Sequence, residues 1–193
     1  MTRAEQKEQA HQRILAAAAR QLREEGLDKA GVQRVMKEAG LTHGGFYSHF
    51  ASKEQLIADA IRNALDGSRE GLLGGGRGEP GPERRRGLLR RYLSPAHRDA
   101  PGAGCPLPST SADVARAPTS VRRAYEEGLR KIIEEFEAEL RDLPEEQMHQ
   151  RARGTLALCV GGLLLARAVD DPTLSDDILE SCRRFAAETE EKR

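Results

Sequence analysis

Apolar residues recur at intervals of three and four positions along most of this chain, which is the spacing of one face of an α-helix. The first such pattern predicts a helix over residues 3–25, which Gly26 ends. Three more long helices are predicted over residues 118–143, 144–169 and 174–189, each starting at or just after a proline, which is tolerated at the start of a helix and not in its interior. We therefore expect an all-α fold.

Two short helices joined by a tight turn are predicted between residues 31 and 50. The first has an apolar stripe with the spacing i, i+3, i+4, formed by Val32, Val35 and Met36. Gly40 fits the position after this helix, where the backbone turns left-handed and glycine does so without strain. Thr42 follows as an N-cap for a second helix over residues 43–50. This arrangement is typical of a helix-turn-helix.

The second helix of this pair is unusual for an element of a core. Gly44 and Gly45 are adjacent in it, and each costs roughly 1 kcal/mol relative to alanine inside a helix. Hydrogen-bonding groups end the side chains of His43, Tyr47, Ser48 and His49. Such a helix suits contact with the phosphates and base edges of a DNA major groove. A surface helical hairpin without a ligand has the same spacing, so the pattern alone leaves both interpretations open.

Residues 39–56 combine three motifs at fixed spacing, the turn A-G-L-T, the segment G-x-F-Y-x-H-F and the helix start S-K-E-x-L. With these motifs the chain resembles the N-terminal signature of the TetR family of bacterial transcription regulators, over about residues 12–65. The resemblance implies an N-terminal three-helix domain with a helix-turn-helix and a C-terminal helical domain for effector binding and dimerisation. We accordingly expect a DNA-binding domain over residues 1–52, an effector-binding and dimerisation domain over 53–193, and a flexible glycine-rich loop over 67–82.

The resemblance also implies which residues contact DNA. Thr42 matches a serine or threonine that contacts phosphate, and Tyr47 matches a tyrosine with the same role. His43 stands where a polar residue reads a base edge, and Lys53 matches a lysine at the start of the next helix. The complete predicted set is Gln33, Thr42, His43, Gly44, Gly45, Tyr47, Ser48, His49 and Lys53.

The chain also departs from the family pattern at three positions. Gly31 replaces a threonine and Gly45 a threonine or serine, so we expect one phosphate contact and one side-chain contact fewer. Ala51 replaces a proline. The dipole at the start of a helix disfavours a basic side chain, so helix stability does not explain Lys53. A contact between Lys53 and a DNA phosphate explains it better.

Composition limits how such a site could bind DNA. The chain has 31 Lys and Arg residues and 31 Asp and Glu residues, so its formal net charge is zero. A neutral protein is not a general polyanion binder, so the site must gather positive charge locally, and two-fold symmetry would double it. The arginine-rich helix predicted over residues 83–93 is expected to pair with the acidic residues of 126–146 rather than to bind nucleic acid. Residues 94–106 should be irregular, with a helix over 109–116.

No motif indicates catalysis, a metal or a cofactor. The five histidines do not form a metal pair at i, i+3 or i+4, and the three cysteines have neither the spacing of a disulfide framework nor that of a zinc site. No catalytic Ser/His/Asp or Cys/His set is recognisable, and the glycine-rich segment lacks the Lys-Ser/Thr of a phosphate-binding loop. We expect no enzymatic activity and no cofactor.

The apolar segments bear on location and assembly. The N-terminal residues lack the apolar region of a secretory signal, and Arg167 interrupts the most apolar stretch, residues 156–169. We therefore expect a reduced, cytoplasmic bacterial protein without membrane association. Because residues 156–169 are apolar nearly all round, that helix should be buried on several sides or pair with a second subunit. In the family the last two long helices form a four-helix dimer interface, which implies a homodimer.

The resemblance implies a small-molecule effector that binds among the middle helices and changes the spacing of the DNA-binding domains. The candidate lining residues are His97, Cys105, Tyr125 and Leu129. Cys105 also permits a thiol-based alternative, since a cation such as Arg98 nearby would lower the pKa of its thiol. An ordinary buried thiol is the other interpretation of Cys105, and Cys159 and Cys182 lie on apolar stripes expected in the core.

The resulting hypothesis is a homodimeric, sequence-specific transcription regulator, favoured as a repressor. It would bind a near-palindromic operator in double-stranded DNA and leave it when an effector binds. Two alternatives stay open. One is a redox- or electrophile-sensing regulator that uses Cys105. The other is a helical-bundle enzyme or carrier for small molecules, in which the helix-turn-helix is only a scaffold.

Overall fold

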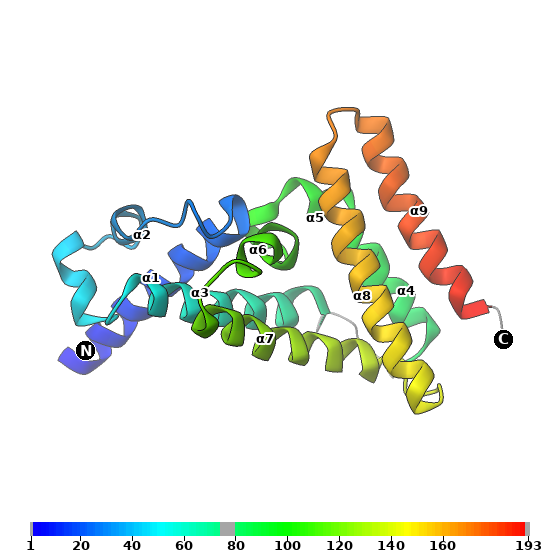
Figure 1. Cartoon of the computed structure of the whole chain (residues 1–193), viewed down its shortest axis with the longest axis horizontal. Coiled ribbons are helices and arrows are strands. Elements are labelled where there is room, and N and C mark those ends of the chain that lie inside the picture. Colours follow the sequence, from blue (N-terminus) through cyan, green and yellow to red (C-terminus); the bar gives the residue numbers. More distant parts are fainter. Residues whose placement is uncertain (1, 74–79, 192–193) are drawn as a thin grey trace. The chain divides into compact units, whose positions relative to one another are not determined.

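A computed structural model describes residues 2–73 and 80–191, and every regular element in these ranges is helical (Figure 1). The all-α prediction is thereby confirmed. The chain divides into two compact units, Met1–Gly67 with Cys105–Gly128 and Ser68–Gly104 with Leu129–Arg193. These units do not coincide with the predicted boundary after residue 52, and the division into a DNA-binding and an effector domain stays a prediction.

The first unit is built on a long N-terminal helix. Thr2 and Glu5 cap its start reciprocally, because the Thr2 hydroxyl accepts from the Glu5 amide and the Glu5 carboxylate accepts from the Thr2 amide. Gly26 ends it, as expected. The elements of this unit are α1 (Arg3–Glu25), α2 (Val32–Glu38), η1 (His43–Ser48), α3 (Lys53–Ser68), α6 (Leu107–Val114) and the first part of α7 (Thr119–Ala138).

Gly26 sits where α6 packs closely against the end of α1. Its backbone has φ +80°, and a β-carbon there would lie 2.6 Å from Asp113 Oδ2. That same carboxylate oxygen accepts a hydrogen bond of 2.9 Å from the backbone amide of Leu27. Glycine is therefore required both by the left-handed backbone and by the close approach of α6.

Replacing Gly26 with alanine is expected to destabilise the fold by about 1–2 kcal/mol, because alanine is strained at positive φ and its methyl group displaces Asp113. For a chain of this size the midpoint of thermal unfolding should fall by roughly 2–8 °C. Gly71→Ala is the matched control, since a β-carbon at this exposed position meets no atom within 4 Å. Equal melting temperatures for both variants would contradict this role of Gly26.

The second unit contains two long antiparallel helices that lie side by side (Figure 1). Gly162 permits their close approach, because a β-carbon there would lie 2.7 Å from Cys182 Sγ. The elements of this unit are η2 (Arg69–Leu73, a π-helical turn), α4 (Pro82–Tyr92), α5 (Pro95–Asp99), η3 (Pro101–Ala103), the rest of α7, α8 (Glu145–Ala168) and α9 (Pro172–Glu191).

Two arginines of α4 are paired with acidic residues of the turn that follows α7, as the sequence predicted. Arg84 Nε lies 2.8 Å from Glu139 Oε1, and Arg85 Nη1 lies 2.9 Å from Asp142 Oδ1. Arg85 also donates to the Glu139 carbonyl at 2.7 Å. These partners favour the structural interpretation of the basic helix over a second nucleic-acid site.

Several predicted boundaries are wrong. The loop expected over residues 67–82 is helical up to residue 73, since α3 continues to Ser68 and η2 follows, while residues 74–79 lie outside the described residues. The stretch 94–106 holds α5 and η3 rather than irregular chain, because Ser94 caps α5 and Pro95 suits its first turn. In addition, α6 begins at Leu107, and α7 ends at Ala138.

In the described ranges, none of the helices has both the length and the apolar character needed to cross a membrane.

Candidate nucleic-acid interface

The turn between α2 and η1 has the geometry expected for a helix-turn-helix. Gly40 adopts φ +72°, and the backbone amide of Leu41 returns to the Met36 carbonyl at 2.9 Å. Val35 and Met36 are fully buried, so the apolar stripe of α2 faces the core. The predicted turn is thereby confirmed at the residue where glycine is needed.

The second helix of the motif differs from the prediction. It is a 3-10 helix over His43–Ser48 rather than an α-helix to residue 50, and the Thr42 side chain makes no capping hydrogen bond. Instead, the Thr42 carbonyl accepts from the Gly45 amide at 3.0 Å. Two adjacent glycines and a length of six residues supply little helical propensity, so tertiary packing decides the local geometry.

Aromatic packing anchors this segment to the rest of the unit. Phe46 and Phe50 are each 2% exposed, with ring centroids 5.8 Å apart. The His11 ring of α1 stacks on Phe50 at 4.7 Å. The inner side of the segment is therefore fixed, which leaves its other side chains available for contact with another molecule.

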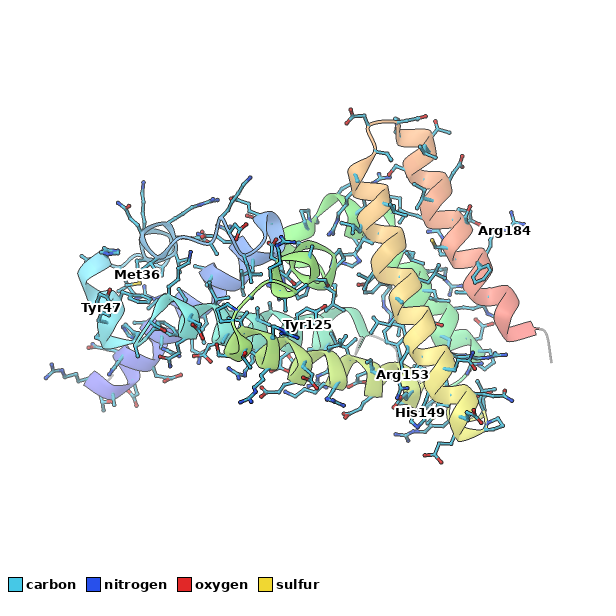
Figure 2. The ribbon with its side chains drawn as sticks, in the orientation of Figure 1. Met36, Tyr47, Tyr125, His149, Arg153 and Arg184 are labelled. Carbon is cyan, nitrogen blue, oxygen red and sulfur yellow. The ribbon has the colours of Figure 1, made fainter. Side chains whose placement is uncertain are left out.

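Most of the predicted DNA contacts lie on the surface. Tyr47 is 74% exposed although it is a large aromatic residue. It lies on η1, whereas the buried Met36 lies on α2 (Figure 2). The exposed members of the predicted set are Gln33, Thr42, His43, Gly44, Tyr47, Ser48 and Lys53, whereas Gly45 and His49 are half-buried. The surface position of these residues is compatible with the predicted role, which stays a prediction.

The two glycines of η1 are not required by the fold. Neither has positive φ, and a β-carbon at Gly44 would meet no atom within 4 Å. At Gly45 it would only reach ordinary contact, 3.8 Å from Met36 Cε and from Thr42 Oγ1. Each glycine nevertheless costs roughly 1 kcal/mol relative to alanine in a helix. A functional reason for glycine is therefore favoured over a structural one.

His49, at the end of η1, has a partly buried imidazole. Burial lowers the pKa of this ring, and repulsion from His11 and Lys7 lowers it further. Its Nδ1 atom is buried and has no hydrogen-bond partner among the described residues. At neutral pH the neutral ring is favoured, so His49 adds no fixed positive charge to this surface.

Contacts that the sequence pattern did not reveal hold α2 against α1. Gln21 is fully buried and donates from Nε2 to Glu38 Oε2 at 2.9 Å, while Arg20 pairs with the other oxygen of Glu38 at 2.6 Å. Arg34 pairs with both oxygens of Glu25 at 2.7 and 2.5 Å. These pairs fix the orientation of α2. The sequence signal that could have indicated the buried Gln21 was a polar residue within the apolar stripe of α1.

The start of α3 places Lys53 beside the motif. Ser52 caps α3, since its hydroxyl accepts from the Gln55 amide at 3.1 Å, and Gln55 Oε1 accepts from the Ala51 amide at 2.8 Å. The exposed Lys53 side chain has no ion-pair partner among the described residues, so its charge is available to a ligand.

The candidate effector residues are divided between the two units. In the first unit Cys105 is 1% exposed, and the Tyr125 hydroxyl lies 2.6 Å from Ser111 Oγ, with burial raising the pKa of the phenol. In the second unit His97 Nδ1 lies 2.7 Å from the Tyr92 carbonyl, and burial lowers the pKa of its imidazole. Leu129 also belongs to the second unit. That the four residues line one pocket stays a prediction.

Cys105, Cys159 and Cys182 are not joined in disulfides, and Cys159 is fully buried as expected while Cys182 is partly exposed. Within residues 2–73 and 80–191, no group of three or more His, Cys, Asp or Glu side chains is placed to hold a metal ion.

The fold and this surface define a helix-turn-helix protein. Residues 14–60 match the family model described as bacterial regulatory proteins, tetR family. The N-terminal part of the chain is therefore of the TetR type. It is 38% identical over 64 residues to the uncharacterized HTH-type transcriptional regulator YvdT of Bacillus subtilis, covering 33% of each chain. It is also 39% identical over 66 residues to the HTH-type transcriptional repressor Rv1474c of Mycobacterium tuberculosis, covering 32% of this chain and 35% of that protein.

Each of these matches covers only about a third of the curated relative. Similarity over nearly the whole chain is found with solved structures. A TetR transcriptional regulator from Chloroflexus aurantiacus superposes with a TM-score of 0.80 at 21% identity, covering 98% of both chains. The reduced form of Escherichia coli NemR superposes with a TM-score of 0.75 at 22% identity, covering 92% of this chain and 94% of that one. These structures support the all-α fold of the described residues.

Proposed function

We propose that this protein is a sequence-specific DNA-binding transcription regulator that represses its target as a homodimer. The observation that carries the proposal is the exposed Tyr47, 74% accessible, on a short glycine-containing segment anchored by the buried Phe46 and Phe50. Exposing a tyrosine beside a fixed aromatic core suits contact with DNA backbone and bases. The relatives named as HTH-type regulators and repressors support the same class.

Dimerisation is supported by apolar side chains left on the surface of α8 and α9. Leu164 is 48% exposed, Leu165 58% and Phe185 62%. Next to Phe185 lies a groove of about 670 Å³ between α8 and α9, which Gly154 and Leu158 help to line. Large exposed apolar residues around a groove are typical of protein–protein contacts. A two-fold symmetric pairing of this face would present two helix-turn-helix motifs to the two halves of a near-palindromic operator.

The direct test is a gel shift with the DNA that flanks the protein's own gene, at two salt concentrations. A discrete complex at dimer stoichiometry that weakens strongly at higher salt is expected, because Lys and Arg contacts release counterions from the phosphates. Tight binding of a small molecule without any salt-dependent DNA complex would instead favour the enzyme or carrier alternative.

Effector release is the regulatory part of the proposal. A ligand shifts the protein between DNA-binding and free conformations only if it binds the two with different affinity. The thiol alternative is weakened by the 1% exposure of Cys105, although Arg23 lies close enough to interact with this thiol electrostatically. A Cys105→Ser protein separates the two, because a ligand sensor would still release DNA on induction and a thiol sensor would not.

Gly44 offers a sharper test of the DNA surface. Gly44→Ala is expected to keep or raise the thermal stability, because alanine favours the helix and its methyl group meets no protein atom. Operator affinity should nevertheless fall by about tenfold, because the added methyl group occupies space where the bound DNA approaches the backbone. Thermal unfolding and fluorescence anisotropy measure the two effects. Unchanged affinity in a folded Gly44→Ala protein would contradict the assigned surface.

A further inference from the structure

A groove of about 310 Å³ lies within the first unit, beside the start of α3. Its walls come from the connection after α1, the first turns of α3, the end of α6 and the start of α7. Lys53, a predicted phosphate contact, is one of its lining residues. The groove is therefore separate from the effector residues proposed above, none of which lines it.

The floor of the groove is apolar. Leu27 and Val121 are buried, with 7% and 1% exposure, and the half-buried Ile57 lies beside them. The volume is close to the lower end of the range for small-molecule sites, roughly 300–1,000 Å³. The shape thus suits a short apolar chain or ring rather than a large ligand.

Most of the carboxylates at the rim already accept hydrogen bonds from other protein groups. Asp113 accepts from the Leu27 amide with one oxygen and from Arg116 Nη2, at 3.0 Å, with the other. Glu54 accepts a hydrogen bond from the Ser120 hydroxyl. Two of the three lining carboxylates are therefore engaged, and the third, Asp28, is exposed to solvent.

Of the two basic residues that line the groove, Arg116 pairs with Asp113, whereas Lys53 has no ion-pair partner among the described residues. Lys53 lines the groove together with the apolar side chains of its floor, and a basic residue beside an apolar surface complements a carboxylate joined to an apolar tail. We propose that this groove binds a small amphipathic carboxylate, with the tail on Leu27, Ile57 and Val121 and the head on Lys53.

Such a ligand would act directly on the DNA surface. A carboxylate on Lys53 occupies the charge that the proposed function assigns to a DNA phosphate, so ligand and operator would compete for the same side chain. This consequence rests on the proposed function, whereas binding of the ligand does not. The groove would then be a second control site, in addition to an effector pocket among the middle helices.

The test is isothermal titration of the full chain, without DNA, with three probes that share one apolar tail, namely octanoate, octylammonium and 1-octanol. Octanoate is expected to bind one per chain and about tenfold more tightly than 1-octanol, because a charge-assisted hydrogen bond adds to the same tail contacts. Octylammonium should bind more weakly than either. No binding of octanoate, or tighter binding of either other probe, would overturn the proposed ligand class.

Two variants locate the site. Lys53→Gln should remove the preference for octanoate over 1-octanol. Ile57→Ala should weaken the binding of both probes while the protein stays folded. Ile133→Ala and Lys131→Gln, which lie on α7 outside the groove, are the controls and should bind like the unaltered chain. Unchanged octanoate affinity in both groove variants would place the ligand elsewhere and overturn the proposal.

A final arm relates the groove to DNA. Octanoate should lower the apparent operator affinity of the unaltered protein. It should have at least several-fold less effect on Ile57→Ala, whose operator affinity without octanoate is expected to equal that of the unaltered protein. Octanoate that binds in the groove and leaves operator affinity unaltered would overturn the competition. If the unaltered protein binds octanoate but binds no DNA, the proposed function is contradicted and the proposed ligand site is not.

Discussion

Replacing Tyr47 with alanine is expected to weaken operator binding by about 10- to 100-fold, the cost of one hydrogen bond to a charged phosphate. Thermal stability should change little, because the side chain is 74% exposed and its aromatic contact with Phe46 is edge-on, with ring centroids 5.2 Å apart. Fluorescence anisotropy with labelled operator DNA measures the affinity, and thermal unfolding measures the stability.

The pattern of loss identifies the kind of contact that Tyr47 makes. A phosphate contact positions the protein without reading sequence, so affinity for operator and for unrelated DNA should fall by the same factor. Tyr47→Phe is the matched variant, because it keeps the ring and removes only the hydroxyl. It should reproduce most of the loss. If the Tyr47→Ala protein binds the operator with undiminished affinity, the DNA contact assigned to Tyr47 is wrong, and the proposed function loses its main support.

Replacing Phe185 with glutamate is expected to convert the proposed dimer to a monomer and to lower operator affinity by at least about 100-fold. The side chain is 62% exposed on α9 beside the groove between α8 and α9. In a symmetric interface one substitution acts twice, and it would bury two unpaired carboxylates. A monomer reads one half-site and loses the second set of contacts.

Analytical ultracentrifugation gives the oligomeric state, and anisotropy at the same protein concentration gives the affinity. Ala96→Glu is the control, because it introduces the same charge at an exposed position of α5 in the same unit. It should remain a dimer that binds DNA. A Phe185→Glu protein that stays dimeric would contradict the assignment of this face.

Local signals predicted one element, the first helix, with the bounds that the structure has. The first helix runs over Arg3–Glu25 as expected, because Gly26 marks its end and its apolar stripe has no interruption by proline. The α5 helix was missed because Pro95 and the residues around it are typical of irregular chain, whereas the Ser94 cap and tertiary packing decide otherwise. The 3-10 geometry of η1 was equally hidden, since helix periodicity does not separate the two helix types over six residues.

The exposure of the candidate DNA-contact residues could be predicted from the sequence better than the grouping of the candidate effector residues. Phe46 and Phe50 are apolar and Tyr47 carries a polar group, so their division between core and surface follows from residue type. The Gln21–Glu38 hydrogen bond joins residues 17 positions apart, and no spacing rule predicts it. The four effector candidates come from segments that fold into two different units, which sequence distance does not report.

The most direct test of the central claim compares the affinity of the unaltered protein for its operator and for the same DNA with the two half-sites shuffled. Both affinities are measured by anisotropy over a range of salt concentrations. Sequence-specific regulation predicts a steep salt dependence for both DNAs and operator binding that is tighter by about 1,000-fold or more. Equal affinity for the operator and the shuffled DNA at every salt concentration would contradict it.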